Sequence, residues 1–119
     1  MIIDQIAGEL REWAFQSMAN EASLHQEISH VLTEMRYKYL REHSISNRAR
    51  VDFYLPEHNI GIEVKVAGGT NAAMRQIHRY NGHDQIDGVI LITSRTSHTL
   101  IPNELNGKPV RVVYIGGIR

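Results

Sequence analysis

The sequence predicts an α/β domain in which helices pack on a mixed β-sheet, with the element order α-α-β-β-β-α-β-β. Two N-terminal segments show helical apolar spacing, and three strand-like segments follow them. After a third helical segment comes an unbroken apolar run, residues 89–92. Such a run is typical of a strand buried on both faces, and its position after a helix predicts a β-α-β crossover with parallel pairing.

Length and composition predict a single globular domain over residues 1–119. The chain is 42% hydrophobic and 22% charged, and it has no cysteine. It therefore cannot form a disulfide, a thiolate zinc site or a cysteine nucleophile. No apolar run approaches the roughly 18 residues that cross a bilayer, and the N-terminus is an acidic amphipathic pattern rather than a signal peptide. We therefore expect a soluble, cytoplasmic protein that does not contact membranes.

The first two elements are predicted to be amphipathic helices over residues 3 to about 18 and 21–35. Asn20 is the expected cap of the second helix. The apolar positions of the first helix are Ile3, Ile6, Ala7, Leu10, Trp13, Ala14 and Met18, and those of the second are Leu24, Ile28, Val31, Leu32 and Met35. The apolar side of the first helix has two possible roles. It can pack on its own sheet, or it can form a dimer contact through Ile2, Ile3, Ile6, Leu10 and Trp13.

Three strands are predicted next, over residues 37–45, 50–55 and 60–66, with turns at Ser46-Asn47 and after Pro56. Alternation in the second strand sets Val51, Phe53 and Leu55 against Arg50, Asp52 and Tyr54. Alternation in the third sets Ile60, Ile62, Val64 and Val66 against Gly61, Glu63 and Lys65. Pairing of these two strands as a hairpin gathers Asp52, Glu63 and Lys65 on one polar face.

The remaining elements are a helix over residues 72–81, closed by Gly82, and two strands. Residues 68–71 supply a turn and an N-cap for this helix. Residues 102–109 are predicted to be a loop, and residues 110–115 a last strand before a glycine-rich tail.

The polar face of the hairpin suits a divalent cation, because two neighbouring carboxylates repel each other unless a proton or a metal ion intervenes. Mg²⁺ prefers oxygen ligands and is usually held by one or two carboxylates. Lys65 would stand beside the ion, where it can stabilise negative charge or take a proton from water. The alternative is a wet outer face with a surface ion pair worth roughly 0 to 1 kcal/mol.

Charge is unevenly distributed although the formal net charge is zero. Residues 1–35 hold six acidic side chains and one basic one, a net of −5, so the rest of the chain carries +5. Five bases lie between Arg36 and Arg50. This modest basic patch fits either phosphate contacts or a solvated strand face. The seven histidines lack a tight ligand spacing and are interpreted as scattered polar residues.

Asp52, followed eleven residues later by Glu63-Val64-Lys65, resembles the core of the PD-(D/E)XK nuclease superfamily of restriction endonucleases, Holliday-junction resolvases and RecB-type exonucleases. Gln76 and Tyr80 match the Gln-x-x-x-Tyr of RecB-type members. Glu27 is the chosen match to the glutamate on the preceding helix, with Glu21 as the alternative. The resemblance covers about residues 21–95 and leaves residues 1–19 outside the family core. It departs from many relatives at residues 48–51, where they place glycine or proline before the aspartate.

The resemblance implies a restriction-endonuclease-like fold and a bound Mg²⁺, with Mn²⁺ as an alternative. Asp52, Glu63 and the Val64 carbonyl would hold the ion, and Glu27 a second metal or its water. Lys65 would orient or deprotonate water, whereas Gln76 and Tyr80 would touch the substrate backbone or brace Lys65. The candidate phosphate contacts are Arg48, Arg50, Arg75 and Arg79, each of which is otherwise an ordinary surface charge.

The expected function is hydrolysis of DNA phosphodiester bonds. No separate target-reading domain fits in 119 residues, so we expect a structure-specific endonuclease acting on a branch, flap or end. A homodimer would supply two sites for two strands. Two alternatives stay open: a non-catalytic nucleic-acid-binding or assembly module with a nuclease fold, and an RNA-cutting nuclease.

Overall fold

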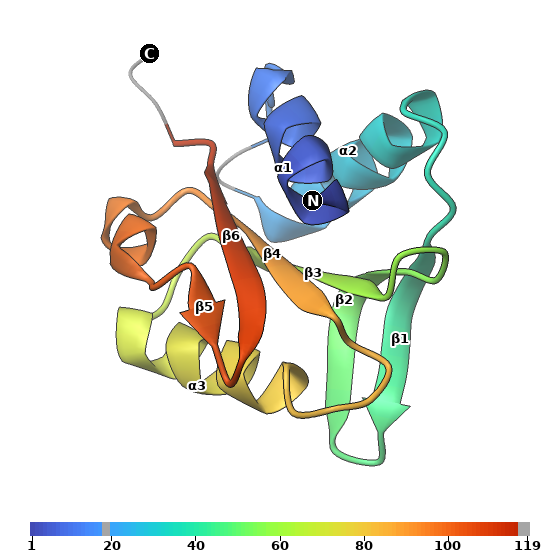
Figure 1. The fold of residues 1–119 in the computed structure, drawn as a ribbon. Coiled ribbons are helices and arrows are strands. Elements are labelled where there is room, and N and C mark those ends of the chain that lie inside the picture. Colours follow the sequence, from blue (N-terminus) through green and yellow to red (C-terminus); the bar gives the residue numbers. More distant parts are fainter. Residues whose placement is uncertain (18–19, 117–119) are drawn as a thin grey trace.

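The chain forms one mixed, six-stranded sheet with helices on both faces, in a computed structural model that describes residues 1–17 and 20–116 (Figure 1). The predicted α/β class is confirmed. The elements are α1 (Ile2–Glu12), α2 (Glu21–Glu34), β1 (Leu40–Ser46), β2 (Ala49–Leu55), β3 (Ile60–Lys65), α3 (Thr70–Tyr80), β4 (Gly88–Thr93), the 3-10 helix η1 (Thr96–Leu100), β5 (Glu104–Leu105) and β6 (Lys108–Tyr114).

The sheet has the strand order β1-β2-β3-β4-β6-β5. Strands β1, β2 and β3 pair antiparallel, whereas β4 lies parallel to both β3 and β6. The predicted parallel crossover is the connection from β3 through α3 to β4. Helices α1 and α2 cover one face of the sheet and α3 covers the other (Figure 1). The central strand β4 is therefore covered on both faces, and every one of its residues is buried.

Helix α1 is shorter than predicted, because it ends at Glu12 and Trp13 is already extended. Met18, the last apolar position predicted for this helix, lies outside the described residues. Ile3, Ile6 and Leu10 are at most 2% exposed and pack in the core between α1, α2 and the sheet. The apolar side of α1 therefore packs on its own sheet, and the alternative of a dimer contact through this side is not supported.

Smaller differences concern the ends of elements. The Asn20 side chain accepts a hydrogen bond from the Ser23 amide at 3.1 Å, which confirms the predicted cap of α2. Helix α3 begins two residues earlier than expected, at Thr70. The predicted loop over residues 102–109 contains β5, which turns into β6 through Asn106 and Gly107, both with positive φ. An Asn-Gly pair is a strong hairpin signal, which the sequence prediction missed.

Strand β2 changes face at Asp52. Phe53 and Leu55 pack in the core under α1 and α2, as alternation predicts, but Val51 packs with Tyr54 in the core under α3. Two residues that a regular strand would set on one side thus lie on opposite sides. The main-chain pairing of β2 with β3 extends from Leu55 to Phe53 and stops there. The predicted alternation of β2 is wrong at this point, and the irregularity positions the candidate site.

None of the helices in the part of the chain that the structure describes has the length and apolarity needed to span a membrane.

Candidate metal centre

The carboxylates of Asp52 and Glu63 each accept a hydrogen bond from the main chain of the neighbouring strand, just beyond the point where the pairing of β2 and β3 stops. The Asp52 Oδ2 atom accepts a hydrogen bond from the Val64 amide at 2.8 Å. In return, the Asp52 amide donates to Glu63 Oε1 at 3.3 Å. Side-chain carboxylates thus replace main-chain carbonyls as acceptors, and the two acids are brought together as predicted.

Lys65 completes this cluster from the end of β3. Its Nζ lies 3.7 Å from Glu63 Oε2, and its side chain is 30% exposed. The N–H and C=O groups of one strand residue face the same neighbouring strand. Because the Val64 amide points to Asp52, its carbonyl faces that side too. The predicted set of Asp52, Glu63, Val64 and Lys65 therefore lies together.

Burial makes this pair of acids electrostatically unfavourable. The Glu63 side chain is only 5% exposed, which contradicts the alternative of a wet outer face for this residue. Burial, followed by the charge of Asp52, raises the pKa of Glu63 to about 8. Burial also raises the pKa of Asp52, although the Val64 amide opposes the shift. Buried acids of this kind need a positive partner to be charged together.

His25 is a site residue that the sequence interpretation missed. It lies on α2, and its Nε2 is 3.8 Å from Asp52 Oδ2. The Nε2 atom of His25 is buried and has no hydrogen-bond partner among the described residues. Ligand atoms of His25, Glu42 and Asp52 all lie within 4.8 Å of one another. The available signal was the position of His25 one turn from the start of a helix that precedes the acidic strands.

The helix acid chosen from the sequence, Glu27, lies elsewhere. Its carboxylate accepts hydrogen bonds from the Trp13 indole at 3.3 Å, from the Gln16 amide at 3.1 Å and from the Ser17 amide at 3.0 Å. Glu27 thus fastens the connection between α1 and α2, and the structure does not bring it to Asp52. The alternative, Glu21, is close enough that its charge raises the pKa of Asp52.

Gln76 and Tyr80 form a pair on α3 that supports β2. The Gln76 amide donates to the Tyr80 hydroxyl at 2.7 Å, and this hydroxyl donates to the Arg50 carbonyl at 3.0 Å. Tyr80 is buried, and burial together with the charges of Glu63 and Asp52 raises its pKa. The pair therefore lies beside the acids and fixes the strand that carries Asp52.

The four candidate phosphate contacts divide into two groups. Arg48 and Arg50 are exposed on the hairpin of β1 and β2, and Arg75 and Arg79 are exposed on α3. Only Arg50 is tied to the cluster, because its guanidinium lies 3.5 Å from Glu42 Oε2.

A buried histidine, His98, lies at the carboxyl ends of the parallel strands. His98 is fully buried, and its Nδ1 lies 2.8 Å from Thr93 Oγ1. Thr93 pairs in register with Lys65 on one side and Tyr114 on the other. Burial lowers the pKa of His98. Neither His98 nor His25 is a fully exposed surface residue, while the interpretation that the histidines do not form a transition-metal site stays a prediction.

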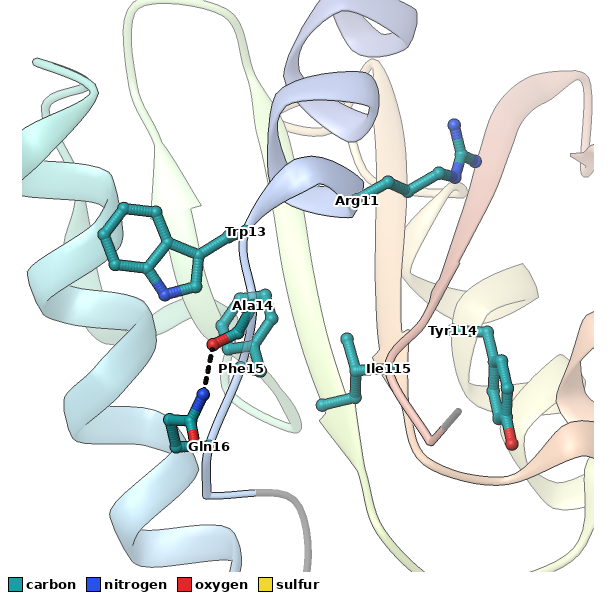
Figure 2. Close-up of a pocket in the computed structure, with 7 residues that line it drawn as sticks. All are labelled: Arg11, Trp13, Ala14, Phe15, Gln16, Tyr114 and Ile115. Atoms are coloured by element: carbon teal, nitrogen blue, oxygen red, sulfur yellow. Dashed lines mark hydrogen bonds between the residues drawn. The ribbon is translucent and has the colours of Figure 1, made fainter. Parts of the chain in front are cut away.

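A hollow of about 470 Å³ lies away from these residues, between the end of α1 and the end of β6 (Figure 2). Its lining contains none of the predicted site residues: Arg11, Trp13, Ala14, Phe15, Gln16, Tyr114 and Ile115. The side-chain Nε2 of Gln16 donates a hydrogen bond to the Ala14 carbonyl at 3.1 Å along one wall (Figure 2). This hollow is therefore separate from the acidic cluster.

Comparison with known proteins gives no match to a family model, to a curated protein or to a solved structure. The function of the cluster is therefore inferred from its geometry.

Proposed function

We propose that this protein is a divalent-cation-dependent nuclease that hydrolyses DNA phosphodiester bonds, acting as an endonuclease on a branch, flap or end. The single observation that carries the proposal is the contact of two acids and a lysine at the break in β2. Asp52 and Glu63 exchange hydrogen bonds across the break, and Lys65 Nζ lies 3.7 Å from Glu63. A surface ion pair does not explain why one of these acids is almost fully buried.

The residues present fit Mg²⁺ or Mn²⁺. Asp52, Glu63 and the Val64 carbonyl offer oxygen atoms. The buried Nε2 of His25, which has no hydrogen-bond partner in residues 1–17 and 20–116, lies 3.8 Å from Asp52 Oδ2. Carboxylate and carbonyl oxygens suit Mg²⁺ and Mn²⁺, whereas an imidazole is uncommon for Mg²⁺. A bound divalent cation makes water more acidic and polarises a phosphate group.

Lys65 is the residue that would handle the proton and the developing charge. Its ammonium lies 3.7 Å from the buried Glu63 carboxylate, and its side chain is 30% exposed, so water and a phosphate can reach it. Its ammonium can stabilise negative charge on a phosphate, and its neutral amine can take a proton from water. Tyr80 and Gln76 hold β2 through the Arg50 carbonyl and so act as positioning residues.

The test compares purified wild-type protein with Glu63→Gln, Lys65→Ala and Glu27→Gln variants on linear, branched and single-stranded DNA and RNA, with and without Mg²⁺. We expect cation-dependent cleavage of DNA by the wild type and by Glu27→Gln only. Equal products from all four proteins would remove the enzyme proposal. Cation-independent binding without cleavage would favour the binding or assembly module, and cleavage of RNA alone would favour the ribonuclease.

The proposal includes a homodimer, which would present one site to each strand of a duplex. Because the apolar side of α1 is buried within one chain, the contact would have to use another surface. Light scattering of the free protein and of its DNA complex tests this part independently of cleavage.

A further inference from the structure

Glu42 and Asp52 face each other at matching irregularities of β1 and β2. Arg41 lies 5.4 Å over the centre of the Phe53 ring, whereas the His43 ring stacks on Tyr54 at 4.5 Å. Phe53 and Tyr54 belong to the cores on opposite faces of the sheet. Arg41 and His43 therefore lie on opposite faces, and the alternation of β1 breaks at Glu42.

The backbone of Glu42 is unusual for a strand. Its φ is 51°, in the left-handed region that residues with a side chain rarely adopt. The other described residues with positive φ, glycines apart, lie outside strands: Arg36, Asn59 and Asn106. Strained backbone of this kind is concentrated at functional sites. Here it aims an acid at Asp52 and at His25, whose buried Nε2 has no partner among the described residues.

Among the residues that the structure describes, Glu42 forms an ion pair with Arg50. The two groups lie 3.5 Å apart, and their side chains are 48% and 64% exposed. An exposed ion pair of this kind contributes only about 0 to 1 kcal/mol. A divalent cation that gains Glu42 as a ligand beside His25 and Asp52 can therefore displace Arg50 at small cost.

We propose that Glu42 exchanges Arg50 for a divalent cation, so that Arg50 is released to bind a nucleic-acid phosphate only when the site is loaded. This proposal rests on the proposed nuclease function in one respect, which is that the anion bound by Arg50 is a nucleic-acid phosphate. The Arg50 main chain is held by the Tyr80 hydroxyl at 3.0 Å, so only the long side chain needs to move. Cation binding and phosphate binding are then coupled through one acid.

The cation half of the exchange is tested without nucleic acid, by titrating Mn²⁺ and following its free signal by electron paramagnetic resonance. Glu42→Gln should weaken Mn²⁺ binding about tenfold, equivalent to about 1.4 kcal/mol, and Arg50→Ala should strengthen it. The matched control is Asp4→Asn, which removes an acid paired with Arg111 at 2.6 Å on another part of the molecule and should change nothing. Equal Mn²⁺ affinity of wild type and Glu42→Gln would overturn the proposal.

The phosphate half is tested with a fluorescently labelled DNA duplex and proteins that carry Lys65→Ala to suppress cleavage. Adding Arg50→Ala should weaken duplex binding about tenfold with Mn²⁺ and little without it. Adding Glu42→Gln should strengthen duplex binding without Mn²⁺, because Arg50 is then free. An equal loss with and without Mn²⁺ on Arg50→Ala would overturn the exchange. If the exchange fails this test but the wild type still cleaves DNA, only the exchange is overturned and the proposed nuclease stands. If the exchange passes but no protein cleaves DNA, only the proposed hydrolysis is overturned.

Discussion

Two glutamates of this chain, Glu27 and Glu63, both accept hydrogen bonds from main-chain amides, yet their surroundings differ. Glu27 receives donors from Trp13, Gln16 and Ser17 and remains half-buried. Glu63 receives one amide at 3.3 Å, has an ammonium at 3.7 Å and is almost fully buried beside a second acid. A carboxylate with enough donors fastens a loop, whereas a buried carboxylate with few donors is suited to bind a cation.

The largest expected difference between the two glutamates is in cleavage. Glu63→Gln should lower the cleavage rate about 10³-fold or more, because it removes an oxygen charge from the proposed cation site. Glu27→Gln should change the rate by less than about threefold, since Glu27 does not contact the cluster. Single-turnover cleavage of a labelled DNA substrate measures both. Similar losses in the two variants would contradict the division of roles.

The second difference is in the pH dependence of stability without divalent cations. The pKa of Glu63 is raised to about 8 in the folded protein, so the folded state binds a proton that the unfolded state has released. The stabilisation of the folded state that the raised pKa of Glu63 provides is complete below about pH 4.5 and is lost as pH rises through about 8. We expect the free energy of unfolding to fall on the order of 3 kcal/mol between pH 5 and pH 9.

Urea unfolding monitored by circular dichroism measures this pH dependence. Glu63→Gln should flatten the curve over the same window, and saturating Mg²⁺ should restore stability to the wild type at high pH. Glu27→Gln should keep the wild-type slope. A wild-type stability that rises steadily from pH 5 to pH 9 would contradict the raised pKa.

The third prediction tests the fastening role of Glu27. Glu27→Ala should lower the free energy of unfolding by about 2 kcal/mol, because three donors of the loop after α1 lose their charged acceptor. Glu12→Ala is the matched control, since Glu12 is exposed at the end of α1 and should cost less than about 0.5 kcal/mol. Chemical unfolding at one pH compares the two, and equal effects would place the loop's stability elsewhere.

The smallest expected effect comes from Tyr80, which supports β2 next to Glu63. Tyr80→Phe removes the hydrogen bond to the Arg50 carbonyl and should cost about 1 kcal/mol of stability. The cleavage rate should fall only a few-fold, because in the proposed function the hydroxyl positions β2 and does not contact the substrate. A loss as large as that of Glu63→Gln would instead make Tyr80 a catalytic residue.

The regular parts of the fold were predictable because their signals are local. Helical apolar spacing, the Asn20 cap and the buried run of β4 depend on residues a few positions apart, and all three are confirmed. The alternation of β3 likewise placed Glu63 and Lys65 together. The early end of α1 was not predicted, and the extended segment after it is held by Glu27, fourteen residues beyond Trp13, which is not a local signal.

The candidate site was predicted in part for the same reason. Glu63 and Lys65 follow from the alternation of β3, whereas Asp52 reaches them at an irregularity of β2 that the alternation did not predict. The choice between Glu21, His25 and Glu27 depends on how α2 is rotated over the sheet. The breaks at Glu42 and Asp52 are changes of face within a strand, which an alternation pattern does not reveal. His25 was missed because a single histidine on a helix carries no spacing signal.

The docking of α1 on β6 has a consequence for how the chain is made. Arg111 bonds to Asp4 at 2.6 Å, and Arg11 donates to the Val112 carbonyl at 2.9 Å, so partners stand more than one hundred positions apart. A ribosome releases α1 long before it releases β6. During that interval the apolar face of α1 lacks the part of the sheet that β6 supplies. Contacts between residues so far apart in sequence also form slowly. The apolar side of α1 therefore stays partly uncovered until β6 has been synthesised.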